Sequence, residues 1–120
     1  MKDKIRALTK MTLDDLVHNR YEKLQQAKIL TEDTAIFLQE VFALQGTLTW
    51  PLDEASVAID VYEMDDQSCF TTEIRYLWFD DEESAVVLFC KAYTNADQTE
   101  ITAFMIDTVD AEYSILAKRS

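Results

Sequence analysis

Hydrophobic residues follow two different patterns on the two sides of residue 55. Before it, apolar side chains recur every three or four positions, as on one face of a helix, and after it they alternate with polar ones, as in strands. The first pattern predicts a helix over residues 13–29, with Thr12 opening a capping box and Asp14 and Asp15 in the first turn. Residues 1–10, which are basic, are expected to form a flexible arm.

A second helix is expected after Thr31, because threonine is a good N-cap residue. Residues 35–44 are apolar on almost every side, which is typical of a buried helix, and Gly46 is suited to end it. A short extended piece over residues 47–50 should follow, closed by Pro51.

Four strand-like runs fill the rest of the chain. The links between them are short and rich in Asp and Asn, which support turns, so the strands should form an antiparallel meander. We therefore expect a single α+β domain over residues 1–120, with helices in 12–46 packed on one face of a four-stranded sheet in 55–108. The tail, 109–120, has room for a short helix. A cystatin-like or NTF2-like wrap is an architectural alternative. The expected strands are 56–63, 69–79, 84–93 and 100–108.

The strand register can be predicted by centring each hairpin on its turn. This pairs Ile59 with Ile74, Ile74 with Phe89, and Phe89 with Phe104, and it places the large apolar residues of all four strands on one face. The helices should cover that face. A shift of one residue would move these side chains to the opposite side.

The opposite face of the predicted sheet is also apolar, and a monomer seldom leaves such a patch bare. Either the chain termini cover it, or it is a homodimer or partner interface rimmed by Asp60, Glu73 and Arg75. The residues assigned to this interface are Leu77, Val86, Leu88, Cys90, Ala92, Ile101, Ala103 and Met105.

Charge is distributed unevenly along the chain, whose net charge is −12. The first 30 residues carry seven Lys/Arg against four Asp/Glu, and the remaining residues carry four against nineteen. Because alternate connections of a meander share one end of the sheet, nine carboxylates are predicted to gather there. They are Asp53, Glu54, Asp80, Asp81, Glu82, Glu83, Asp107, Asp110 and Glu112.

This acidic end has two main interpretations. It is either a solvated rim that keeps the protein soluble, or a site for a basic protein surface, as in protein mimics of DNA. Such charge argues against direct binding to nucleic acid or to an acidic membrane. Calcium is a weaker third interpretation, because the EF-hand pattern with its central glycine is absent.

The sequence contains no catalytic motif. Its one glycine, Gly46, excludes a P-loop and a Rossmann fingerprint. The one histidine, His18, falls on the polar side of the first predicted helix, and one histidine with two cysteines is too few for a usual zinc site. Cys69 and Cys90 are offset by about 13 Å in the predicted register, too far for a disulfide. We therefore expect no enzyme, no metal and no cofactor.

These observations favour a cytoplasmic protein-binding module. No stretch is long and apolar enough for a membrane helix, and no secretory signal follows the basic start. The preferred function is an inhibitor, antagonist or immunity-type protein that occupies a basic, nucleic-acid-binding site on a partner. In size and charge alone the chain resembles immunity, anti-restriction and anti-CRISPR proteins. The alternatives are a dimeric acidic chaperone or adaptor of the secretion-chaperone kind, and a cone-shaped α+β domain that binds a small ligand.

Overall fold

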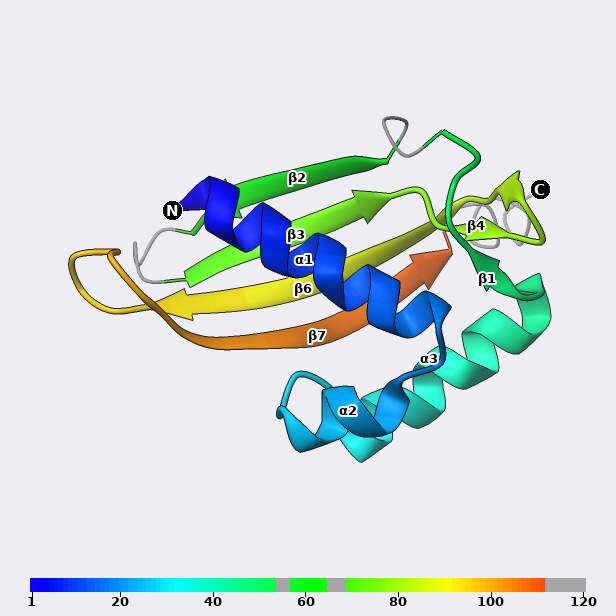
Figure 1. Cartoon of the computed structure of the whole chain (residues 1–120), viewed down its shortest axis with the longest axis horizontal. Coiled ribbons are helices and arrows are strands. Elements are labelled where there is room, and N and C mark those ends of the chain that lie inside the picture. Colours follow the sequence, from blue (N-terminus) through cyan, green and yellow to red (C-terminus); the bar gives the residue numbers. More distant parts are fainter. Residues whose placement is uncertain (54–56, 65–68, 112–120) are drawn as a thin grey trace.

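Three helices occupy the first third of the chain, and two antiparallel sheets follow (Figure 1). The computed structural model describes residues 1–53, 57–64 and 69–111. Within these residues the protein has an α+β fold, as predicted. The tail beyond residue 111, where we expected room for a helix, lies outside the described residues. The helices are α1 (Lys2–Val17), α2 (Tyr21–Gln26) and α3 (Glu32–Gln45).

The larger sheet is the predicted meander, with its four strands adjacent in chain order. The expectation of one sheet is wrong, however, because the predicted strand 69–79 is interrupted after Arg75 and its last part pairs elsewhere. That part, β4, joins a small second sheet of order β1-β4-β5. The larger sheet consists of β2 (Ala58–Glu63), β3 (Cys69–Arg75), β6 (Val86–Thr94) and β7 (Ile101–Ala111). The smaller sheet consists of β1 (Leu48–Thr49), β4 (Trp78–Phe79) and β5 (Glu82–Glu83).

Helix α1 begins at Lys2, so the predicted flexible arm is wrong. Its buried face includes Thr9 and Thr12, whose hydroxyls donate to the carbonyl oxygens of Ile5 and Leu8 at 2.8 and 2.9 Å. These bonds satisfy polar groups that burial would otherwise leave unpaired. Two polar threonines thus occupy positions where an amphipathic helix would have apolar residues. For this reason the hydrophobic pattern did not predict a helix over the first residues of the chain. Thr12 lies inside α1 and caps nothing.

The predicted helix over residues 13–29 is two helices. The first ends at Val17, and Asn19 then adopts a left-handed conformation with φ 58°. Asparagine tolerates this region better than most residues. The amide of Arg20 donates to the carbonyl oxygen of Asp15 at 2.8 Å, which closes the turn before α2. Asp15 consequently lies in the last turn of a helix and not in the first.

The ends of α3 are as predicted. The amide of Thr34 donates to the Thr31 side chain at 3.2 Å, and Gly46 ends the helix at φ 130°. The expectation of a buried helix is wrong, because only Ala35, Leu38 and Phe42 are buried. Helix α3 packs against the edge strand β7 and leaves part of its apolar surface uncovered.

The predicted register holds in the first hairpin, where Ile59 pairs with Ile74. It is wrong in the second, where Ile74 pairs with Leu88, one residue from the predicted Phe89. In the third, pairing begins at Thr94 and Ile101, and two bulges, between Tyr93 and Thr94 and between Phe89 and Cys90, shift it further, so that Phe89 lies opposite Thr108. The link between β3 and β6 contains the β4–β5 hairpin, so centring on a simple turn misplaced it.

Because a shift of one residue exchanges the two faces of a strand, most of the predicted outer patch lies in the core. Leu77, Val86, Leu88, Cys90 and Ala92 are each at most 1% exposed. Their placement on an outer interface is therefore wrong. Of the other three residues assigned there, Ala103 is exposed, and Ile101 and Met105 are partly buried.

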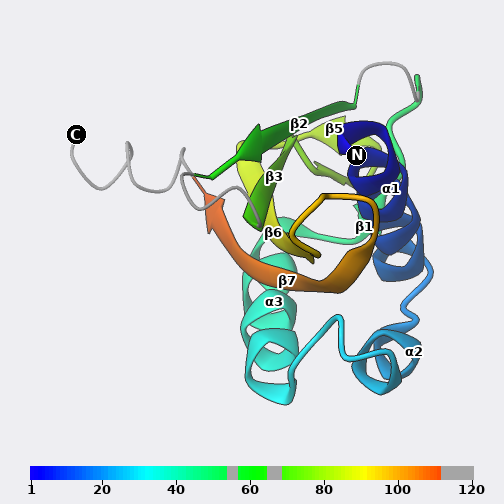
Figure 2. The same ribbon diagram turned by 90° about the vertical axis from the view of Figure 1, so that its left-hand side faces the viewer.

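The larger sheet is curved, and α1 lies on its concave side (Figure 2). This helix contacts β2 and β3, and the hydroxyl of Thr9 meets that of Thr72 on β3 at 3.5 Å. The C-terminal end of α1 extends towards α2 and β1, where charged side chains gather. None of the described helices combines the length and the apolarity that a membrane span requires.

Candidate functional site

The predicted acidic end contains an acidic hairpin, formed by Asp80, Asp81, Glu82 and Glu83. Asp80 and Asp81 join β4 to β5 with φ values of 52° and 62°. Two consecutive left-handed residues are the signature of a tight two-residue hairpin whose twist matches that of its strands. All four side chains are exposed.

The acidic hairpin is anchored to the end of α3. Thr47 donates its amide to Asp80 Oδ1 at 3.2 Å and accepts the Asp80 amide at 2.8 Å. The amide of Asp81 donates to the hydroxyl of Thr49 at 3.0 Å. A side chain at Gly46 would collide with the Asp80 carboxylate, so this close approach requires glycine.

Several basic residues elsewhere in the molecule form local ion pairs with carboxylates. Arg6 pairs with Asp3 at 3.0 Å, and Arg75 pairs with Glu73 at 2.7 Å on the predicted interface rim. Across the described ranges, no Lys or Arg forms an ion pair with any of the four hairpin carboxylates. Four exposed charges within a Debye length of each other create a negative potential that extends into solvent.

The other predicted members do not all lie at the acidic end. Asp53 is exposed before β2, and Asp110 lies opposite Val87 near the end of β7. Asp107 lies in the middle of β7, 4.0 Å from the ammonium of Lys91, and does not belong to this end. Two further predicted members, Glu54 and Glu112, lie outside the described residues.

An exposed apolar stripe on α3 leads towards the acidic hairpin. This α3 stripe consists of Ile36, Phe37 and Leu44, which are 50%, 43% and 86% exposed. Leu44 stands two residues before Gly46, the residue that contacts Asp80. Leu44, the last residue of the stripe, therefore lies near the acidic hairpin at the C-terminal end of α3.

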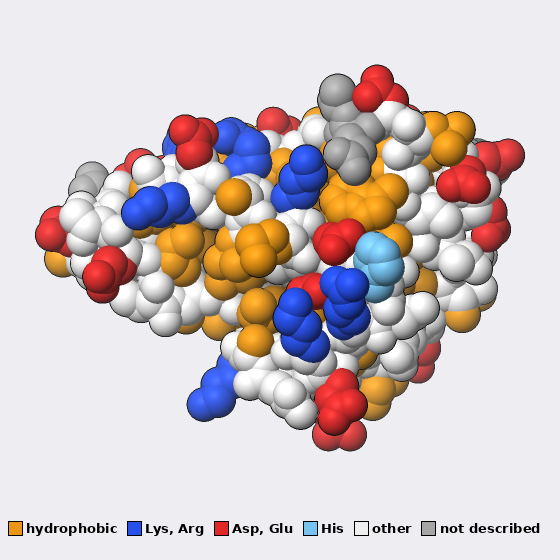
Figure 3. Space-filling model, viewed as in Figure 1, with side chains coloured by type: hydrophobic (Ala, Val, Ile, Leu, Met, Phe, Trp, Pro, Cys, Tyr) orange, Lys and Arg blue, Asp and Glu red, His pale blue; other side chains and the backbone are white. Residues whose placement is uncertain are grey.

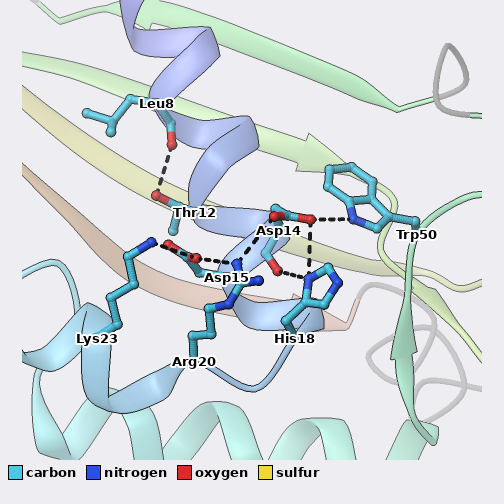
Figure 4. Close-up of polar contacts among 8 residues, drawn as sticks. All are labelled: Leu8, Thr12, Asp14, Asp15, His18, Arg20, Lys23 and Trp50. Carbon is cyan, nitrogen blue, oxygen red and sulfur yellow. Dashed lines mark hydrogen bonds and ion pairs between the residues drawn. The ribbon is translucent and has the colours of Figure 1, made fainter.

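A second polar cluster lies at the C-terminal end of α1, and the sequence did not suggest it (Figure 4). The carboxylate of Asp15 is buried, and its Oδ1 accepts hydrogen bonds from Arg20 at 3.0 Å and from Lys23 at 3.1 Å. Burial works to raise the pKa of Asp15, but the hydrogen bonds and charges of Arg20 and Lys23 outweigh it and lower the pKa below its ordinary value.

The neighbouring Asp14 links this cluster to Trp50, the residue that follows β1. Its Oδ1 accepts the indole N–H of Trp50 at 2.8 Å, and its Oδ2 lies 3.5 Å from Arg20 Nη1. His18 Nδ1 donates to the Asp14 carbonyl oxygen at 2.8 Å. Carboxylates at the end of a helix oppose its dipole, so the adjacent cations offset an unfavourable position.

These side chains border an open cavity of about 520 Å³, which we call the α1 cleft. Small-molecule sites commonly fall within about 300–1,000 Å³. Figure 3 shows basic side chains beside acidic ones and an apolar surface on this face of the molecule. The α1 cleft is lined by Ala7, Lys10, Met11, Asp14, Asp15, Arg20, Lys23 and Trp50.

The sequence offered only a weak signal for this cleft. Asp14 and His18 have the spacing of one helical turn, but Asp15 reaches Lys23 only because the chain turns between α1 and α2. Trp50 is 36 residues from Asp14, and no local pattern connects them.

The remaining candidate groups are two cysteines and one histidine. Cys69 and Cys90 are buried free thiols, and Cys90 lies opposite Thr72 instead of the predicted Glu73. Burial raises the pKa of Cys90 to about 12, so its reactive thiolate is scarce at neutral pH. His18 is exposed, as predicted. In the described part of the chain, no three His, Cys, Asp or Glu side chains come together as metal ligands would.

Comparison with known proteins yields a family. No curated protein and no solved structure matches the chain. Residues 13–109 match a family described as a domain of unknown function, DUF7668. The matched region contains the acidic hairpin, the α3 stripe and most of the α1 cleft. Because it spans well over half of the sequence, the chain belongs to the DUF7668 family.

Proposed function

We propose that this protein is a small acidic binding module that occupies a basic site on a partner protein, as an inhibitor, antagonist or immunity-type protein does. The observation that carries this proposal is the acidic hairpin. Its four exposed carboxylates have no ion-pair partner among the described residues, and Gly46 and Thr47 hold it in place.

The hydrogen bonds that anchor the hairpin support a binding role over a solubilising one. Charges on a preformed turn lose less conformational freedom on binding than charges on a flexible chain. A basic surface that otherwise holds nucleic-acid phosphate would meet several carboxylates at once, and their field would accelerate association. Neither a small loss of conformational freedom on binding nor faster association is needed for solubility alone.

The α3 stripe supplies the apolar component of the proposed interface. Charges contribute mainly to association rate and specificity, whereas buried aromatic and aliphatic anchors hold a complex together. Phe37 and Leu44 are exposed enough to serve as such anchors. The partner surface would therefore combine an apolar groove with a basic rim.

A dimeric chaperone and a catalytic role receive less support. A dimeric chaperone was expected to use the outer sheet face, but five of the eight residues assigned to it are buried in the core. We propose no catalytic role either, because the Cys90 thiol is buried and His18 Nδ1 is engaged by its own helix.

The proposal can be tested with a variant that neutralises the hairpin without loosening it. Asp81→Asn, Glu82→Gln and Glu83→Gln are combined, and Asp80 is kept because it accepts from Thr47. Asparagine tolerates the left-handed conformation of residue 81. The matched control combines Glu22→Gln, Glu32→Gln and Glu100→Gln, which change the net charge equally at exposed positions elsewhere.

Each protein is used to capture partners from lysate of the native host at increasing salt. We expect the parent and the control to retain the same partner, which should disappear when the lysate is first depleted on phosphocellulose. The hairpin variant should lose that partner at low salt. Equal capture by the hairpin variant and the control would refute the proposal.

A further inference from the structure

We propose that the α1 cleft binds a small amphipathic anion, with a flat apolar body and one carboxylate or phosphate group. This site lies on a different surface from the acidic hairpin and is independent of the function proposed above. The cleft offers hydrogen-bond donors to a ligand and holds them in position. An apolar wall lies beside them.

In the α1 cleft, the carboxylates already accept hydrogen bonds, whereas the two cations still have N–H groups that a ligand could use. Asp15 Oδ1 accepts from both Arg20 and Lys23, and the two oxygens of Asp14 face Trp50 and Arg20. Towards the described residues, Arg20 uses only Nη1 and Lys23 makes a single hydrogen bond. A guanidinium has five N–H donors and an ammonium three, so both cations keep donors for a ligand.

The two cations are also held in position. Arg20 and Lys23 come from the turn after α1 and from α2, and the buried carboxylate of Asp15 draws both to one point. Their side chains are 45% and 64% exposed, so they border the cleft and remain accessible. Because these two positive groups are already held in position, binding of an anion would cost little conformational entropy.

The apolar wall explains why the ligand should carry a flat body. Met11 is 62% exposed although it lines the cleft, and Ala7 is exposed beside it. The indole of Trp50 is oriented by its hydrogen bond to Asp14. An aromatic face and a thioether together are well suited to contact a planar apolar group.

The charge of the whole protein limits the ligand to a compact anion. At a net charge of −12, the molecule repels an extended polyanion over most of its surface. The α1 cleft is bordered by Lys10, Arg20 and Lys23 and by two carboxylates, Asp14 and Asp15, so positive charges exceed negative ones by one (3 − 2). A ligand with one anionic group can remain within their local field.

The experiment titrates the full-length protein with four naphthalene probes and follows the indole N–H of Trp50 by NMR. The signal is assigned by its absence from Trp50→Phe. The probes are 2-naphthoate, 2-naphthyl phosphate, the neutral 2-naphthylmethanol and the cationic 2-naphthylmethylamine. We expect saturable shifts with the two anions at a Kd about tenfold below that of the alcohol, and weaker binding still of the amine. The tighter of the two anions identifies the preferred head group.

Two variants and one control locate the interaction. Lys23→Met should weaken the anions about tenfold and leave the alcohol unchanged. Met11→Ala should weaken the anions and the alcohol alike. Lys91→Met makes the same charge change on β6, where Lys91 pairs with Asp107, and should have no effect. Circular dichroism checks that each variant is folded.

Three results would overturn the inference. The first is that the alcohol or the amine binds as tightly as 2-naphthoate. The second is that Lys91→Met weakens the anions as much as Lys23→Met does. The third is that no probe shifts the Trp50 signal at millimolar concentration.

Discussion

The acidic hairpin and the α1 cleft handle negative charge in opposite ways. The hairpin displays four carboxylates to solvent, and no cation of the described residues neutralises them. In the cleft, Asp15 is buried and neutralised by Arg20 and Lys23. Asp14-Asp15 and Asp80-Asp81 are both pairs of consecutive aspartates, yet the first pair contacts cations and the second is exposed to solvent. The role of a charged residue can be assigned only when the position of its counter-charge is known.

The largest effect should come from the support of the hairpin. Gly46→Ala places a side chain in a backbone region that only glycine adopts readily and against the Asp80 carboxylate. We expect the free energy of unfolding to fall by about 2–4 kcal/mol, measured by urea denaturation. Ala43→Gly, an exposed helical position three residues earlier, is the comparison and should cost about 1 kcal/mol. Similar losses in the two variants would mean that the hairpin is not anchored as described.

The next effect concerns the buried carboxylate of the cleft. Asp15→Asn removes the charge that holds Arg20 and Lys23, and we expect a loss of about 1–3 kcal/mol in the free energy of unfolding. Glu82→Gln, which neutralises an exposed hairpin carboxylate, should change it by less than about 0.5 kcal/mol. Equal losses of stability in the two variants would show that the cleft carboxylate and the hairpin carboxylate do not differ in their contribution to folding.

The pH dependence of stability should distinguish the same two carboxylates. The pKa of Asp15 is lower in the folded protein than in the unfolded chain. Its contribution is therefore fully present above the unfolded value of about 3.9 and is lost as pH falls through the lower, folded value. The gap in stability between the parent and Asp15→Asn should be constant from pH 5 to 7 and shrink below pH 4. A gap that widens with acid would contradict the described ion pairs.

The smallest effect is expected from neutralising the hairpin. The variant with Asp81→Asn, Glu82→Gln and Glu83→Gln should be as stable as the parent within about 0.5 kcal/mol, because exposed substitutions rarely cost more. Any change should be a slight gain at low salt, since mutual repulsion is relieved, and it should vanish at high salt. Thermal melts at two salt concentrations measure it. A clear loss of stability would show that the carboxylates have a structural role.

Local features of the sequence determined much of the fold. Thr31 and Gly46 mark the two ends of α3 because capping depends on the residue itself and its immediate neighbours. The first hairpin and the strand order follow from short links and alternation. The acidic hairpin was also predictable, since four consecutive acids in a turn must be exposed. These properties depend on residues that are close together in the chain, so they can be predicted directly from the sequence.

Only the tertiary structure decided which surfaces meet. Thr9 and Thr12 are buried because their hydroxyls bond within α1, so a polar residue type occupied a core position. Leu88 moved from the predicted outer face to the core because the β4–β5 hairpin shifted the register by one residue. The α1 cleft exists because a turn at Asn19 returns Arg20 and Lys23 to Asp15, and because β1 brings Trp50 to Asp14. Such contacts depend on the sum of many weak packing preferences along distant segments, which no local pattern of residues records.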